Sequence, residues 1–208
     1  KFIMKLEVKI SHKKVDYSKA VQLLEKRVNE VIEGKKPELL WILEHNSIYT
    51  GGTGYKSEDI LDKDINVIKT LRGGKITHHG PGQKIIYFVL DLNKRKKNIR
   101  LLITKIENCI IQILNNYNIK SFPDRNKIGI WVNHETGIKK IAAIGIRVRK
   151  WIAYHGFSIN VSNSLKFYES IIPCGIIDRG IINIKSINKK NYKDINKVII
   201  KNLNYFFK

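Results

Sequence analysis

Cysteine, proline and methionine are scarce in this chain, which contains two, four and one of them among its 208 residues. Two cysteines are too few for a disulfide scaffold or a cysteine-based zinc site, so a reducing compartment is expected. Long apolar runs are also missing, because no stretch of about 18 apolar residues is without charge, which argues against a transmembrane helix. The N-terminal segment KFIMKLEVKI carries charges through its apolar part and lacks a cleavage site of small residues, so it favours a strand over a signal peptide. We therefore expect a cytoplasmic protein.

Acidic residues are few compared with basic ones: 18 aspartates and glutamates stand against 39 lysines and arginines, giving a net charge of +21. Such a charge favours an anionic partner, which could be nucleic acid, a membrane surface or an acidic protein. The lysines are spread through every segment, however. The densest runs, residues 94–97 and 147–150, are not interleaved with the aromatic side chains on which single-stranded nucleic acid stacks. The sequence therefore gives nucleic-acid binding little support.

Apolar residues make up 43% of the chain, which is enough for the core of one domain spanning residues 1–208. Their alternating and helical spacings predict a mixed α/β (α+β) fold with a sheet at its centre. Strands are expected at residues 2–10, 39–43, 66–70, 84–92, 127–132, 141–148 and 151–161. Helices are expected at residues 17–33, from Arg100 onwards, at 164–170 and from Asn191 onwards, with residues 45–56, 133–139 and 173–175 in loops or turns.

The most unusual segment is RGGKITHHGPGQ at residues 72–83, which holds four glycines, one proline and two adjacent histidines. Glycines allow positive φ and let the backbone approach another group closely, so this segment cannot be a regular helix or the interior of a central strand. β-Branched and aromatic residues flank it on both sides, which predicts a strand–loop–strand element. It is either an ordinary glycine-rich hairpin or a loop wrapped against a ligand, with Arg72 and His79 pointing into a pocket.

The two cysteines differ in their surroundings. Cys109 lies on the apolar stripe of the second predicted helix, which indicates a position in the core. That stripe consists of Leu102, Ile103, Ile106, Ile110, Ile113 and Leu114. Cys174 lies on no periodic stripe and stands between Pro173 and Gly175, so it is a candidate nucleophile. An ordinary thiol is mostly protonated at neutral pH, so a nearby cation would be needed to form the thiolate.

Four side chains could supply that cation: His78, His79, His155 and Lys140. Lys140 begins the segment KIAAIG, whose small residues leave room for a ligand beside a strand. A solvated lysine at the end of a strand would give the same pattern. The three histidines could instead hold a metal ion, but adjacent histidines in a strand point to opposite faces and rarely share one.

Three segments together resemble a known family. RGGKITHHGPGQ, KKIAAIGIRV followed by YHGFSINV, and IPCGI match, in order and almost without gaps, the signature regions of the octanoyl-[acyl-carrier-protein]:protein N-octanoyltransferases, the lipoyl(octanoyl) transferases of lipoate biosynthesis. The resemblance covers nearly the whole chain, from WILEH at Trp41 to IPCGI at Cys174. It departs from the family at His78, where a tyrosine is usual.

The resemblance implies a fold shared with biotin and lipoate protein ligases, in which helices flank a mixed sheet. It implies an acyltransferase that carries an octanoyl group as a thioester on Cys174, with Lys140 lowering the pKa of that thiol and acting as general acid and base. The substrate-binding residues would be Arg72, Gly73, Gly74, Lys75, Ile76, Thr77, His78, His79, Ala143, Ile144, Gly145, Gly156, Phe157 and Ser158. The donor would be octanoyl-acyl carrier protein, which is acidic. The acceptors would be lysines on the lipoyl domains of 2-oxoacid dehydrogenases and on the glycine cleavage H protein.

The resemblance further implies a monomer that needs no metal or other cofactor, because the thioester is already activated, and that binds neither nucleic acid nor membrane. Backbone N–H groups beside Cys174 would stabilise the oxyanion of the reaction. The main alternative is an ATP-dependent lipoate or biotin protein ligase, which shares the fold and a glycine-rich loop but needs no nucleophilic cysteine. The other alternative, a non-enzymatic basic module that binds nucleic acid, gives no reason for a cysteine at position 174.

Overall fold

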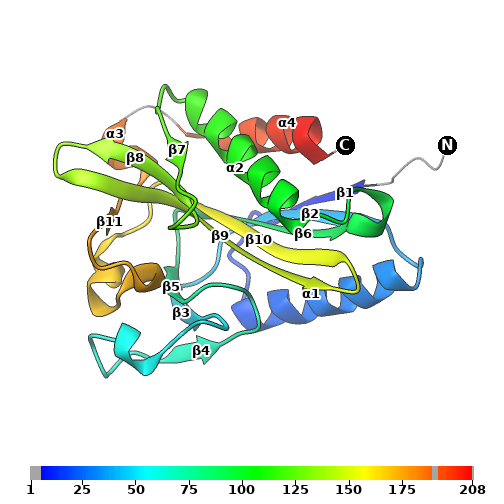
Figure 1. Cartoon of the computed structure of the whole chain (residues 1–208), viewed down its shortest axis with the longest axis horizontal. Helices are drawn as coiled ribbons and strands as arrows, with labels where there is room; N and C mark the ends of the chain where they lie inside the picture. The colour runs from blue at the N-terminus through cyan, green and yellow to red at the C-terminus, as the bar shows by residue number, and fades with distance from the viewer. Residues whose placement is uncertain (1–5, 189–191, 208) are drawn as a thin grey trace.

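The computed structural model describes residues 6–188 and 192–207. Eight strands of this part of the chain form one mixed sheet: β1 (Leu6–Ile10), β2 (Glu38–Leu43), β6 (Gln83–Asp91), β7 (Phe122–Pro123), β8 (Ile130–His134), β9 (Gly137–Arg149), β10 (Ile152–Asn160) and β11 (Gly180–Ile181). Their order across the sheet is β1-β2-β6-β10-β9-β8-β7, with β11 paired to β9 (Figure 1). β1 runs parallel to β2 and β11 parallel to β9, whereas the other neighbours are antiparallel. The predicted mixed sheet is therefore confirmed.

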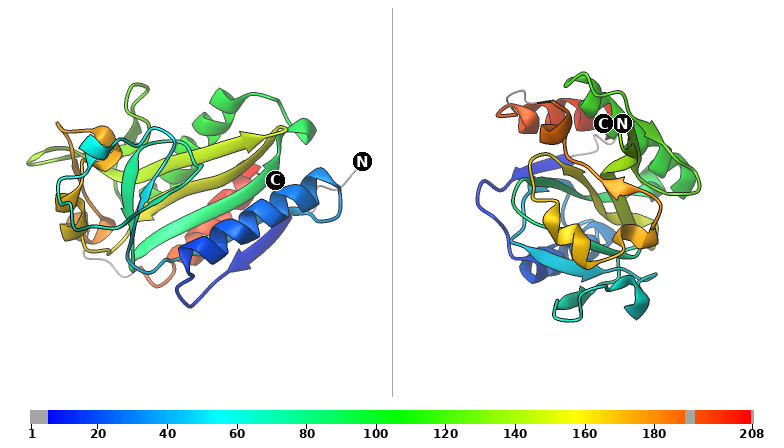
Figure 2. Two further views of the ribbon diagram at one scale, coloured as in Figure 1. Left: turned by 90° about the horizontal axis from the view of Figure 1, so that it is seen from below. Right: turned by 90° about the vertical axis from the view of Figure 1, so that its left-hand side faces the viewer.

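Helices cover both faces of this sheet (Figure 1, Figure 2). α1 (Tyr17–Ile32) packs on one face, and α2 (Ile99–Asn115) and α4 (Ile195–Phe207) pack on the other, while α3 (Ile184–Ile187) is a single turn after β11. Successive residues of a strand point to opposite faces. β6 therefore sends one set of side chains toward α1, namely Ile85, Tyr87 and Val89, and the other set toward α2 and α4, namely Ile86, Phe88 and Leu90.

The first helix shows how the sequence sets the bounds of an element. The carboxylate of Asp16 accepts a hydrogen bond from the backbone N–H of Lys19 at 2.9 Å, which caps the helix at its N-terminus. Ala20, Leu24 and the residues one turn further on are buried against the sheet. Gly34, at a φ of +70°, follows the last turn in the left-handed conformation that ends many helices. The helix predicted at residues 17–33 is confirmed, as is the core position of Cys109 on α2.

A second, three-stranded sheet lies on the same side of the main sheet as α1 (Figure 1). It consists of β3 (Ile48–Gly51), β4 (Val67–Lys69) and β5 (Ile76–His79) in the order β4-β3-β5. Two of these strands contradict the predictions, because β3 lies in the expected loop at residues 45–56 and β5 lies inside the glycine-rich segment. Both contain β-branched or aromatic residues, but each is only four residues long. Their pairing within the small sheet, of β3 with both β4 and β5, makes them strands, and a sequence pattern does not show such pairing.

Other boundaries differ from the predicted ones by a few residues. The turn expected at residues 133–139 spans only residues 135–136, because the β8–β9 hairpin pairs as far as His134 and Gly137. The C-terminal helix begins at Ile195, whereas its expected start, Asn191, and residues 2–5 of the first strand lie outside the described residues.

The spacing of apolar residues predicts that the C-terminal helix buries Ile195, Val198, Ile199, Leu203 and Phe206. Burial on the outer helices differs in detail from the expected stripes. Ile103 on α2 and Val198 and Phe206 on α4 are half-buried, and Phe207 takes the core position at the end of the chain. Within the part of the chain that the structure describes, no helix combines the length and apolar character needed to cross a membrane.

Gly156 is the position in the sheet least able to accept a side chain. A Cβ built on it would lie 2.0 Å from the backbone oxygen of Ile86, which cannot move unless the β6–β10 pairing opens. We expect Gly156→Ala to lower the free energy of unfolding by about 3 kcal/mol, measured by chemical denaturation. Gly54→Ala is the control, because its Cβ would meet no atom closer than 3.5 Å. Equal stability of the two variants would contradict this account of the sheet.

Candidate active site

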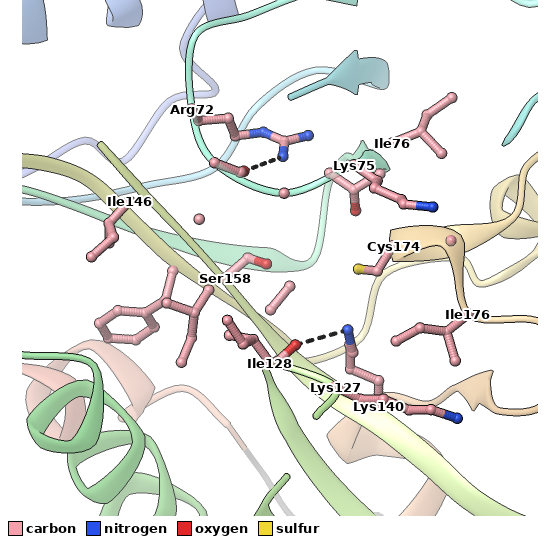
Figure 3. Close-up of a pocket in the computed structure, with 18 of the residues that line it drawn as sticks. Arg72, Lys75, Ile76, Lys127, Ile128, Lys140, Ile146, Ser158, Cys174 and Ile176 are labelled. Atoms are coloured by element: carbon pink, nitrogen blue, oxygen red, sulfur yellow. Dashed lines mark hydrogen bonds between the residues drawn. The ribbon is translucent and has the colours of Figure 1, made fainter. Parts of the chain in front are cut away.

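A pocket of about 810 Å³ lies along the outer edge of β9 (Figure 3). Pairing with β8 ends at Ala142, and beyond this residue the glycine-rich loop, residues 72–83, approaches the strand edge. The N–H of Gly73 donates to the carbonyl oxygen of Ile146 at 3.2 Å. The lining residues that the sequence analysis expected are Arg72, Gly73, Gly74, Lys75, Ile76, Thr77, His79, Lys140, Ala143, Ile144, Gly145, Gly156, Phe157, Ser158 and Cys174.

Glycines let the loop lie close to its neighbours. A Cβ on Gly52 would stand 2.3 Å from the backbone oxygen of Gly74, and one on Gly145 would stand 3.2 Å from that of Gly73. The N–H of Gly52 donates to the backbone oxygen of Lys75 at 3.1 Å, which holds the loop against the segment that follows β3. The glycine-rich segment is thus a loop packed on two sheets, and not an isolated hairpin.

Arg72 anchors this loop. Its guanidinium is buried and donates to the backbone oxygen of Thr50 at 2.8 Å, to the Thr50 hydroxyl at 2.9 Å and to the backbone oxygen of Gly73 at 3.0 Å. These acceptors are carbonyls and a hydroxyl, so dipoles stabilise its charge. A guanidinium does not lose its proton near neutral pH. Its contacts therefore favour a role in ordering the loop.

The inner end of the pocket is polar. The Nδ1 atom of His79 lies 2.7 Å from the side-chain oxygen of Gln83. Because the amide nitrogen of Gln83 donates to Asn160 at 2.8 Å, its oxygen is the acceptor, which puts the proton of His79 on Nδ1. Burial, followed by the neighbouring His45, keeps the pKa of His79 well below its usual value.

His155 is turned toward the pocket by an unusual backbone conformation, with a φ of +67°. Its ring stacks on Tyr154 at 5.0 Å, and neither ring nitrogen has a hydrogen-bond partner among the described residues. Burial and, to a lesser extent, two nearby arginines lower the pKa of His155 to about 4. It is therefore uncharged at neutral pH.

His78 is the expected binding residue that does not line the pocket. Successive residues of β5 point to opposite sides, so His78 faces away from His79. Its Nε2 atom lies 2.8 Å from the hydroxyl of Ser47, its ring stacks on Phe167 at 4.4 Å, and burial lowers its pKa to about 4. Within the described ranges, no three histidine, cysteine or carboxylate side chains are placed to share a metal ion.

The neutral histidines narrow the choice of a cation for the thiol. His78, His79 and His155 all have lowered pKa values, so none of them carries a charge at neutral pH. Of the four candidates that the sequence offered, Lys140 is the one that remains.

Lys140 reaches the pocket because of an irregularity in the sheet. The register shifts between Ile130 and Trp131, which pair with Ala142 and Lys140, respectively. The strand β9 therefore has one extra residue at this point. Such a bulge changes which side chains share a face, so Lys140 and Ala143 both line the pocket although they are three positions apart, an odd number.

The Lys140 side chain is almost completely shielded from solvent. The residue is 2% exposed, and its Nζ atom donates to the backbone oxygen of Ile128 at 3.1 Å. The same atom lies 4.8 Å from the centre of the Trp131 ring.

Cys174 occupies the middle of a single 3₁₀ turn, Pro173–Gly175. Its φ of +57° is uncommon for a residue with a side chain. Figure 3 shows the sulfur of Cys174 and the amine of Lys140 both pointing into the pocket. Cys109, by contrast, is fully buried on the core-facing side of α2, and burial raises its pKa to about 12.

The two backbone N–H groups that follow Cys174 are already hydrogen-bonded. The N–H of Gly175 donates to the oxygen of Ile172 at 2.9 Å, and the N–H of Ile176 donates to the oxygen of Pro173 at 3.1 Å. Both groups are used inside the turn, so they can stabilise an oxyanion only if the turn opens.

Several residues that line the pocket were not expected from the sequence, and they include Ile85, Tyr87, Ile128, Ile146 and Asp178. Ile85 and Tyr87 could have been predicted to line the pocket, because they are alternate residues of β6 and lie on the same face of the sheet as Ser158. Ile128 and Asp178 come from irregular segments that carry no pattern. These segments meet at the mouth of the pocket, where Lys127 and Asp178 form an ion pair at 2.6 Å.

Comparison with known proteins identifies the class. A family model described as the lipoyl protein ligase A/B catalytic domain matches residues 16–206. The structure has a TM-score of 0.74 with a bipartite lipoate protein ligase from Thermoplasma acidophilum, at 12% identity over 98% of this chain and 84% of that one. With a lipoate-protein ligase A bound with ATP the TM-score is 0.72, at 16% identity over 96% and 85%. Such identities show the fold alone, and with the family model they define a lipoyl protein ligase A/B catalytic domain.

Relatives of higher sequence identity show which family within this class the chain belongs to. An octanoyltransferase of Ehrlichia chaffeensis is 42% identical over 97% of this chain and 96% of its own. An octanoyltransferase of Ehrlichia ruminantium (strain Gardel) is 44% identical over 97% and 99%, and one of Wolbachia pipientis wMel is 43% identical over 87% and 89%. The chain belongs to the octanoyltransferase family, which confirms the family and the ligase-like fold predicted from its motifs.

The buried histidines predict sensitivity to acid. Since the pKa of His155 falls from 6.5 to about 4 on folding, the unfolded chain binds more protons between these values. Stability present above pH 6.5 is therefore lost as the pH falls toward about 4, and His78 and His79 act in the same direction. We expect His155→Gln to reduce the pH slope of the unfolding free energy by up to about 1.4 kcal/mol per pH unit in this window. The exposed His134 provides the control variant His134→Gln, and equal slopes in the two would refute the assignment.

Proposed function

We propose that this octanoyltransferase moves an octanoyl group from acyl carrier protein to the ε-amine of a lysine on a lipoyl domain, through a thioester on Cys174. The proposal rests on one observation. The side chains of Cys174 and Lys140, which are distant in sequence, line the same pocket. A thiol on a tight turn and a nearly dry amine are the groups that acyl transfer through a cysteine needs.

In the first half of the reaction, Lys140 takes the proton of the Cys174 thiol. The thiolate attacks the carbonyl carbon of the donor thioester, forming a new carbon–sulfur bond. The old carbon–sulfur bond breaks, and the carrier sulfur leaves with the proton that Lys140 returns to it. One thioester replaces another, so the step needs no nucleotide.

In the second half, the amine of the target lysine attacks the octanoyl carbonyl on Cys174. An amide bond forms, the bond to the Cys174 sulfur breaks, and Lys140 accepts a proton from the attacking nitrogen. Lys140 therefore acts first as base, then as acid, and again as base.

The pocket offers separate surfaces for the parts of the substrate. Its apolar wall suits an alkyl chain and consists of Ile103, Ile128, Ile144, Ile146 and Phe157. The net charge of +21 favours encounter with an acidic carrier protein. In this proposal the enzyme works as a monomer, with lipoyl domains as acceptors.

Replacing each cysteine in turn tests the nucleophile. Cys174→Ala should abolish transfer and leave no acyl adduct, because no thiolate can form in the pocket. Cys109→Ala should retain nearly full activity, since that thiol is buried in the core. The measurement is intact-protein mass spectrometry after mixing with octanoyl-acyl carrier protein, followed by peptide mapping. Equal activity of the two variants would overturn the assignment, and adenylate formation from ATP and free octanoate would favour a ligase instead.

Replacing the lysine tests the base. Lys140→Arg keeps a positive charge but cannot accept a proton near neutral pH, so transfer should fall by about 100-fold or more. The assay is steady-state transfer to a lipoyl domain, with circular dichroism to verify folding. Lys139→Arg, at the neighbouring and more exposed position, serves as the control. Full activity of Lys140→Arg would mean that Lys140 acts only as a fixed charge or has no role.

A further inference from the structure

Trp131 is a buried indole in contact with two cations. It lies on β8 directly opposite Lys140 on β9 and is 1% exposed. The amine of Lys140 is 4.8 Å from the ring centre, and the guanidinium carbon of Arg179 is 4.7 Å from it. The indole N–H donates to the backbone oxygen of Lys127 at 2.8 Å, which fixes the orientation of the ring.

The carboxylates near this ring are engaged elsewhere. Asp178 pairs with Lys127 at 2.6 Å, and Asp124 pairs with Arg179 at 2.6 Å. Among the described residues, none lies within ion-pair distance of Lys140. One carbonyl oxygen, that of Ile128, and the aromatic face are therefore the polar surroundings that the structure gives to this amine.

We propose that Trp131 is a positioning residue, which holds the Lys140 amine at the pocket and stabilises its ammonium form beside the Cys174 thiolate. The inference rests on the base role proposed for Lys140. The face of an indole attracts a cation through its quadrupole, more strongly where water is excluded. It attracts a neutral amine far less, so the ring favours the charged state without binding the proton itself.

The aromatic ring of Trp131 suits the Lys140 amine better than a carboxylate would, because this amine must lose and regain a proton. A buried carboxylate would hold the ammonium strongly and oppose the loss of its proton. The ring stabilises the ammonium only modestly, which leaves Lys140 able to give and regain a proton during each turnover. Arg179 lies on the same ring, and the other ionisable groups that line the pocket are Arg72, Lys75, His79, Tyr87, Lys127, His155, Cys174 and Asp178. The Lys75 amine is beside the Cys174 turn, since a Cβ built on Gly175 would lie 2.3 Å from it.

The test compares Trp131→Leu, which removes the aromatic face, with Trp131→Phe, which keeps part of it. The readouts are the rate of Cys174 alkylation by iodoacetamide as a function of pH and the rate of acylation by octanoyl-acyl carrier protein. Trp131→Leu should move the alkylation profile to higher pH and slow acylation at neutral pH by about 3- to 10-fold, with a smaller change in Trp131→Phe.

Trp41 provides a matched control. Its indole is 2% exposed, its N–H donates to Ser11 at 2.9 Å, and the amine of Lys9 lies 4.3 Å from its ring, but it does not line the pocket. Trp41→Leu should lower stability and leave the pH profile unchanged.

A third variant separates failure of this inference from failure of the proposed function. If Lys140→Met leaves the alkylation profile of Cys174 unchanged, the proposed role of Lys140 is wrong. If Lys140→Met shifts the profile and Trp131→Leu does not, only the role of Trp131 is wrong. If Trp131→Leu does not fold, Trp131→Phe is the deciding variant. The inference would then be overturned if Trp131→Phe had the same alkylation profile and the same acylation rate as the unmodified enzyme.

Discussion

The pocket depends on the hydrogen bonds that the buried guanidinium of Arg72 makes. The guanidinium joins the glycine-rich loop to Thr50 on the small sheet, while the next residue, Gly73, bonds to Ile146 at the edge of β9. An edge strand normally needs a partner or a cover. Here the loop covers the edge without continuing the ladder, so a space remains beside the strand. Without Arg72 the loop that bonds to the edge of β9 would lose its side-chain hydrogen bonds to the small sheet.

Three irregular backbone positions bring reactive or polar side chains into that space. A bulge at the β8–β9 pairing exposes Lys140 to the pocket, a positive φ turns His155 inward, and a positive φ presents the sulfur of Cys174. In a regular strand only alternate residues share a face, so without the bulge Lys140 and Ala143 would not line the same pocket. Irregular conformations cost free energy and persist where surrounding structure enforces them. Two of the five non-glycine residues with positive φ in the described chain, His155 and Cys174, lie at this pocket, which fits a functional site.

The sequence predicts the regular parts of this molecule well, because period and composition are local properties. The helix at residues 17–33, the hairpin of β9 and β10, and the burial of Cys109 all follow from spacing alone. The strands β3 and β5 do not, since they are short and depend on partners that are distant in sequence.

The site was predictable only through its motifs. Their resemblance to a family indicated nearly every expected lining residue, whereas the residues by themselves left four candidate cations. His78 is the exception, because its neighbour His79 takes the inward-facing position of β5. Ile128 and Asp178 lie in segments without a repeating pattern, and their place at the pocket follows from folding that brings the two segments together.

Lys140 differs from the other lysines of the described chain in being buried. Of the chain's 39 lysines and arginines, those that are buried within the described residues are Arg72 and Lys140. Burying a charge is unfavourable unless dipoles or partners compensate it. Arg72 is compensated by three hydrogen bonds and has a structural task, but Lys140 has one carbonyl and the face of Trp131. A lysine that only stabilised the fold would gain more from a carboxylate, so its sparse surroundings suit an amine whose proton must be able to leave.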